Sequence, residues 1–148
     1  MDKNILFIAR IYYIELVAIS VTTICLIVWL ISVIAKMIGN YKIDKPFSLN
    51  IVGAILLAIF LVLFVKGEMI YLKDFQYMIK KEFLYITGRV DKVGALGDMG
   101  GRRVFFVDIE TGERVGIHAP TNEVKIGEIY EVMYLPHTEI GSYVKKIE

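Results

Sequence analysis

Two long apolar stretches dominate the first half of the chain. Leu16 to Ala35 and Pro46 to Val65 each hold 20 residues without a charged side chain. An α-helix rises about 1.5 Å per residue, so about 20 apolar residues match the roughly 30 Å hydrocarbon core of a bilayer. The pattern therefore predicts two membrane-spanning helices, over about 11–37 and 46–72, with a short polar link between them.

Two other interpretations of these stretches carry less weight. Buried helices of a soluble core would need more chain around them than remains once both stretches are set aside. A cleaved signal peptide is an alternative for the first stretch, but its apolar region exceeds the usual ~7–15 residues. We therefore expect an integral membrane protein that keeps both helices.

The periodicity of apolar residues changes twice after the second stretch. From Lys66 to Phe83 it stays helical among charged residues, which predicts that the second helix continues along the bilayer surface or as a stalk. From Leu84 onward it alternates, which predicts five short strands. Their expected ranges are 84–90, 103–110, 113–119, 128–135 and 142–147, with Thr111-Gly112 as a tight hairpin turn.

The predicted fold class is α+β. Residues 1–81 form a transmembrane hairpin with a juxtamembrane helix, and residues 82–148 form a small five-stranded antiparallel β-barrel of OB-like or SH3-like type. Closure of so small a sheet would protect its edges. Phe105, Val107 and Ile109 share one face of the second strand, and Phe105 is expected in the core with Tyr130 and Tyr134.

Charge divides the chain at the same place. Residues 1–81 carry a net charge of +4 and residues 82–148 a net charge of −3. Six lysines and arginines flank the spans on the side of the termini, against three in the link. By the positive-inside rule, this bias predicts a multi-pass protein of the cell membrane with both termini and the C-terminal domain in the cytoplasm. The three lysines of the link leave the reverse orientation open.

A glycine-rich segment, Gly94 to Arg103, precedes the second predicted strand. Its glycine spacing matches neither the dinucleotide fingerprint nor a P-loop, and a strand rather than a helix follows it. The segment is therefore predicted to be a hairpin loop. Loops of small barrels often bind partners, and the candidate partner-binding residues here are Gly97, Met99, Arg102 and Arg103; a solvated tip without function is the alternative.

The sequence indicates no nucleic-acid-binding, metal-binding or catalytic site. A net acidic domain does not suit nucleic acid, and His118 and His137 lack neighbours at metal-ligand spacing. No set of nucleophile, base and orienting residue is apparent, so we expect neither an enzyme nor a cofactor. The single cysteine, Cys25, lies in the first apolar stretch and reads as a packing residue. Membrane lipid is one expected partner, and Ala54 and Ala58 have the small-residue spacing that could support a homo-oligomer or the packing of the hairpin.

The segments Gly88-Arg89-Val90, Val104-Phe105-Phe106, Thr111-Gly112-Glu113 and Gly127 to Pro136 carry a resemblance. In them the chain resembles small membrane proteins of Gram-positive bacteria in which two helices precede a short β-domain. The layout is also similar to NfeD-like proteins, whose OB domain follows membrane helices and serves membrane proteases and stomatin-like scaffolds. The chain lacks the proline-glycine signature of those domains, so the resemblance assigns no residue a role.

Together these observations predict a membrane-anchored, non-enzymatic module that presents a small β-barrel to a protein partner at the cytoplasmic surface. The alternative is an immunity or exclusion protein that acts through its membrane hairpin.

Overall fold

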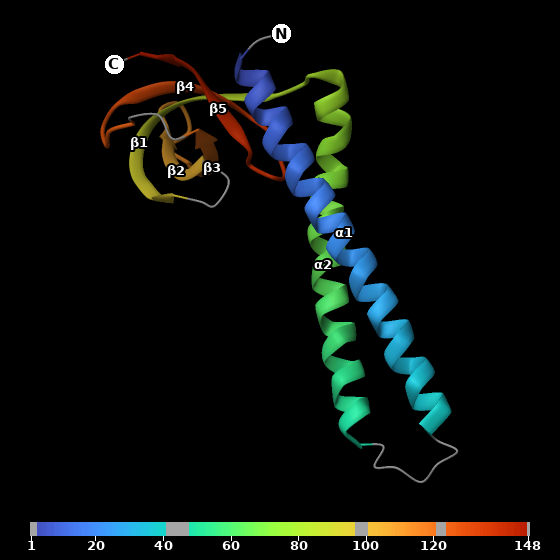
Figure 1. Ribbon diagram of the computed structural model, residues 1–148. Helices are drawn as coiled ribbons and strands as arrows, with labels where there is room; N and C mark the ends of the chain where they lie inside the picture. Colours follow the sequence, from blue (N-terminus) through green and yellow to red (C-terminus); the bar gives the residue numbers. More distant parts are fainter. Residues whose placement is uncertain (1–2, 41–47, 97–100, 121–123, 148) are drawn as a thin grey trace. The chain divides into compact units, whose positions relative to one another are not determined.

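The computed structural model describes residues 3–40, 48–96, 101–120 and 124–147. Two helices, α1 (Lys3–Asn40) and α2 (Ser48–Lys80), are followed by five strands. The strands are β1 (Leu84–Leu96), β2 (Gly101–Asp108), β3 (Arg114–Pro120), β4 (Ile129–Tyr134) and β5 (Gly141–Lys146) (Figure 1). The α+β class and the order of elements predicted from the sequence are confirmed.

The chain divides into two compact units, and each helix contributes residues to both of them. One unit comprises residues 15–70, the central parts of both helices. The other combines residues 1–14 with residues 71–148 and so includes the outer ends of both helices with the whole sheet. We call them the helical unit and the sheet unit.

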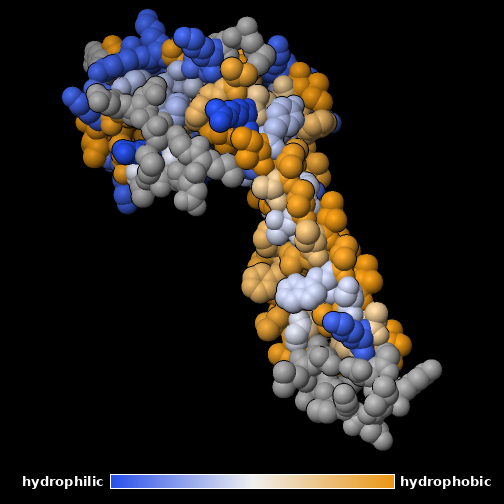
Figure 2. Space-filling model, viewed as in Figure 1, coloured by the Kyte–Doolittle hydropathy of each residue, from blue (hydrophilic) through white to orange (hydrophobic). Residues whose placement is uncertain are grey.

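The helical unit exposes its apolar side chains. Both α1 and α2 are long and apolar enough to cross a membrane, and only 6% of the most apolar window of each helix is buried. Figure 2 shows hydrophobic residues along the visible face of this unit. A core helix of a soluble protein would be mostly buried, so packing within this chain leaves these surfaces uncovered.

A polar contact joins the two helices within the helical unit. The Ser20 hydroxyl donates a 2.9 Å hydrogen bond to Oε1 of Glu68. Beside it the helices approach closely, because a Cβ added to Gly67 would lie 2.8 Å from Cδ1 of Ile19. Ala54 is half-buried and Ala58 is exposed, and their role in an oligomer stays a prediction.

Helix α2 ends in a backbone motif that does not use glycine. Lys81 adopts a left-handed conformation with φ of 58°. The amide of Glu82 donates to the carbonyl of Tyr77 at 3.0 Å, and that of Lys81 to the carbonyl of Met78 at 3.4 Å. This pair of bonds is a Schellman motif, which satisfies the last carbonyls of a helix and turns the chain away from its axis. The turn brings the chain into β1 within three residues.

The sheet has the strand order β3-β2-β1-β4-β5, with every ladder antiparallel. β1 is longer than predicted and reaches Leu96, since it pairs with β4 along its first half and with β2 along its second. In the described sheet, His118 of edge strand β3 forms a parallel bridge with Ile140, which directly precedes edge strand β5, and the His118 amide donates to the carbonyl of Glu139 at 2.8 Å. No continuous ladder closes the described sheet, so the barrel stays a prediction.

The core of the sheet unit corrects the face predicted for β2. Val104 and Phe106 are buried, whereas Phe105 is half-buried and Ile109 is exposed. The register explains the difference: Phe106 lies opposite Val90 of β1 and Val115 of β3, inside the core cluster. The placement of Phe105 in the core was therefore wrong.

One buried carboxylate fastens α2 to the turn between β4 and β5. The Asp74 side chain has no exposed surface. Its oxygens accept hydrogen bonds from the amide and hydroxyl of Thr138, both at 2.7 Å, and from the amide of His137 at 3.2 Å. The Nδ1 atom of His137 lies 2.8 Å from Oδ1. Four donor groups thus compensate the desolvation of one charge.

Candidate partner-binding face

The structure describes two of the four residues that the sequence grouped as a binding loop. Gly97 and Met99 lie outside the described residues. Arg103 is exposed and forms an ion pair with Glu139, which precedes β5. Arg102 lies on the core side of β2 opposite Ala119, and its Nε atom is buried without a hydrogen-bond partner in the described part of the chain. Of the two arginines, only Arg103 therefore reaches the outer surface of the sheet.

Arg103 belongs to a small cluster on the outer side of β2 and β3. Its guanidinium carbon lies 5.8 Å from the centre of the Phe105 ring, and that of Arg114 lies 4.7 Å from the same centre. Gly116 stands opposite Phe105, and a Cβ there would lie 2.9 Å from the ring. The absence of a side chain at Gly116 thus leaves room for the ring to lie across β3, where cation–π contacts hold it.

A β-bulge extends this cluster onto β1. Val90 pairs with Phe106 and Lys92 with Phe105, so Asp91 is the extra residue. Bulges re-aim side chains. Here the Asp91 carboxylate meets the guanidinium of Arg114 at 2.7 Å. The ion pair neutralises both groups and fixes Arg114 over the phenyl ring.

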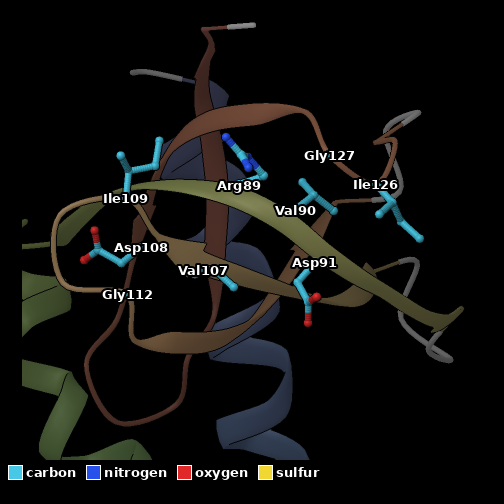
Figure 3. Close-up of a pocket in the computed structure, with 9 residues that line it drawn as sticks. All are labelled: Arg89, Val90, Asp91, Val107, Asp108, Ile109, Gly112, Ile126 and Gly127. Carbon is cyan, nitrogen blue, oxygen red and sulfur yellow. The ribbon is translucent and has the colours of Figure 1, made fainter.

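Beside the bulge lies an open groove with a volume of about 560 Å³. It is lined by the middle of β1, the end of β2 and the turns at Gly112 and Gly127, and Figure 3 labels all nine lining residues. Both glycines have positive φ values, 72° and 92°, a conformation that favours glycine. The glycine in each turn therefore favours the backbone conformation of that turn, so the groove between the two turns exists before a ligand binds.

The groove combines apolar walls with one available cation. Ile109 and Ile126 are 52% and 69% exposed, and Figure 3 shows Arg89 and Val90 between them. Arg89 is exposed and makes no ion pair with any described residue. Asp108 instead accepts a 2.9 Å hydrogen bond from the amide of Glu110, which organises the turn. Such a groove suits a ligand with an apolar group and an acidic group close together.

Glu128 holds the turn that carries Ile126. Its carboxylate accepts hydrogen bonds from the Lys146 ammonium at 2.6 Å, the Tyr130 hydroxyl at 2.7 Å and the Lys125 amide at 3.1 Å. The bond from Lys146 contributes most to lowering the pKa of Glu128 to about 2. Burial, together with the neighbouring carboxylate, raises the pKa of Tyr130 to about 12. The charged form of Glu128 is thus the one that the fold stabilises.

We expect Glu128→Gln to flatten the acid dependence of stability. Because the pKa of Glu128 is about 2 in the fold and 4.5 for the free group, its contribution is present above pH 4.5 and is lost as the pH falls towards 2. The free energy of unfolding of the wild type should therefore fall more steeply across this window than that of the variant. Urea titrations of the detergent-solubilised chain at several pH values measure this. Glu110→Gln, at an exposed turn, is the matched control; equal slopes for all three proteins would contradict the expectation.

No cluster of three or more His, Cys, Asp or Glu residues suited to a metal ion occurs among the described residues. The groove and the cluster around Phe105 offer an apolar cleft, a cation and an aromatic ring. Sequence reasoning missed Arg89, Ile126 and Asp91, whose proximity depends on strand register and on the bulge. No family model and no curated protein matches the sequence.

Proposed function

We propose that the chain is a membrane-anchored protein-interaction module whose groove binds an extended segment of a partner protein. The observation that carries the proposal is the exposed Arg89 between Ile109 and Ile126, in a groove whose turns are already fixed. An apolar side chain of the partner would enter between the isoleucines, and a neighbouring carboxylate would meet Arg89.

Anchoring through two membrane spans is part of the proposal. It is supported by two helices of sufficient length and hydropathy with uncovered apolar side chains. The charge bias of the flanking residues favours a multi-pass arrangement in the cell membrane with both termini and the sheet unit in the cytoplasm. An anchor confines the groove to the membrane surface, which raises its effective concentration for partners held there.

We further propose that the sheet is an OB-like barrel. The order β3-β2-β1-β4-β5 and the parallel bridge from His118 to Ile140 support it, because the bridge joins the two edges of the sheet. A shared core of residues from all five strands supports it as well. The layout would then be similar to that of NfeD-like proteins.

Site-specific photo-crosslinking in cells tests the proposed groove. A benzophenone amino acid at position 126 of the full-length protein should give a discrete adduct that contains a second protein. Arg89→Glu should abolish this adduct, because the acidic group of the partner would then face a like charge. Lys145→Glu, an equal charge change at an exposed position of β5, should leave it unchanged.

The crosslinker at position 147 is the matched control, because Ile147 is also an exposed isoleucine but lies outside the groove. Adducts of equal yield at both positions, or an adduct that persists in Arg89→Glu, would contradict the groove as the binding site. An adduct of the chain with itself would identify a second copy as the partner.

A further inference from the structure

The outer end of α2 carries an apolar stripe that packing within the sheet unit leaves uncovered. Leu72, Phe75 and Ile79 are 55%, 40% and 61% exposed. Their spacing of three and four residues places them on one face of a helix. The opposite face carries Asp74 and Met78, which are buried. This end of α2 therefore packs one face within the sheet unit and leaves the apolar stripe uncovered.

Two lysines lie beside the stripe. Lys73 and Lys80 are seven residues apart, so they share one flank of the helix, and both are exposed. No described residue forms a salt bridge with either lysine. An apolar stripe flanked by lysines is typical of helices that lie at the interface of an anionic membrane.

The length of α2 points to the same environment. Its 33 residues extend about 50 Å, longer than the roughly 30 Å hydrocarbon core. Its exposed apolar residues continue without a break of more than three residues from Leu63 through Val65, Met69 and Leu72 to Ile79. Exposed apolar residues therefore extend along α2 beyond the length that one span needs.

We propose that Leu72, Phe75 and Ile79 lie in the headgroup region of the bilayer, with Lys73 and Lys80 against anionic lipid headgroups. The inference rests on the proposed membrane anchoring and deepens it. The membrane surrounds the spanning helices, and in addition its surface binds the sheet unit. Because Asp74 on the same helical segment holds the turn before β5, lipid contact at the stripe restrains the sheet unit as well.

Depth-dependent quenching in vesicles tests this inference. The full-length protein carries Cys25→Ser and either Phe75→Cys or Ile79→Cys, labelled with an environment-sensitive fluorophore. It is reconstituted in phosphatidylcholine vesicles with or without phosphatidylglycerol. Nitroxides placed near the headgroups should quench both labels more strongly than nitroxides placed deep in the acyl chains. A label at Glu110→Cys, an exposed turn position, should not be quenched by either.

The lysines are tested in the same vesicles. Quenching of the label at position 79 should increase with phosphatidylglycerol, and Lys73→Gln with Lys80→Gln should abolish the increase. The double variant Lys125→Gln with Lys145→Gln removes two exposed lysines of the sheet unit and should preserve the increase. Labels at 75 and 79 that behave like the label at 110, or an increase that survives loss of Lys73 and Lys80, would overturn the inference.

Trp29, the single tryptophan, reports separately on anchoring. It lies within α1 and is exposed. Deep nitroxides should quench it if α1 spans the bilayer. Quenched Trp29 with unquenched labels at 75 and 79 would refute only the interfacial stripe. Unquenched Trp29 would refute the proposed anchoring itself.

Discussion

Asp74→Ala is expected to lower the free energy of unfolding of the sheet unit by about 3–5 kcal/mol. The substitution removes the acceptor of four donor groups, two from His137 and two from Thr138. The backbone amides of His137 and Thr138 then lack their hydrogen-bond acceptor. An unsatisfied buried donor costs about 1–3 kcal/mol. Urea denaturation of the detergent-solubilised chain, followed by near-ultraviolet circular dichroism, measures the change.

Two further variants define the cause of that loss. Asp74→Asn keeps one carbonyl oxygen as acceptor and should lose less stability than Asp74→Ala. Glu110→Ala removes an exposed carboxylate and should stay within about 0.5 kcal/mol of the wild type. Hydrogen exchange at the amides of 137 and 138 should accelerate in Asp74→Ala. If it does not, Asp74 is not what holds the turn.

Phe106→Ala is expected to lower the free energy of unfolding by about 3–5 kcal/mol, because it empties a fully buried aromatic site. The ring packs edge-on against Tyr143, with centroids 6.3 Å apart, and lies over Gly88. Phe105→Ala is the matched control on the same strand. It removes a half-buried ring and two cation–π contacts, so we expect about 1–2 kcal/mol. Urea denaturation compares the two; a larger loss for Phe105→Ala would restore the face predicted from the sequence.

The β2 sequence shows why that face could not be read from periodicity. The run Val104-Phe105-Phe106-Val107 is apolar at both odd and even positions, so alternation does not choose between them. Neighbouring strands make the choice, because Val90 and Val115 meet Phe106. The helices were easier to predict, since about 20 consecutive apolar residues have few other interpretations.

Asp74 shows a second reason why part of the structure could not be predicted from the sequence. Within its helix it stands among Lys73, Gln76 and Lys80, and it resembles any solvent-facing carboxylate of a charged segment. Its donors follow 63 and 64 residues later, in a turn whose position depends on the whole sheet. The sequence therefore identified the helix and the turn, and tertiary packing joined them.

The candidate groove could not be predicted from local sequence patterns either. Arg89, Ile109 and Ile126 come from β1, the end of β2 and the turn before β4, so only the strand register brings them together. The glycine-rich loop attracted attention because its composition is unusual.

The division of the chain into units sets an order for its biogenesis. The sheet unit is assembled from both ends of the sequence, around residues 15–70. One contact within it, from the Ser142 hydroxyl to Oδ1 of Asn4 at 3.0 Å, joins residues 138 positions apart. Asn4 therefore completes its packing only after Ser142 has left the ribosome. Both helices precede Ser142 in the sequence, so under the proposed anchoring they are available for insertion into lipid before the sheet unit is complete.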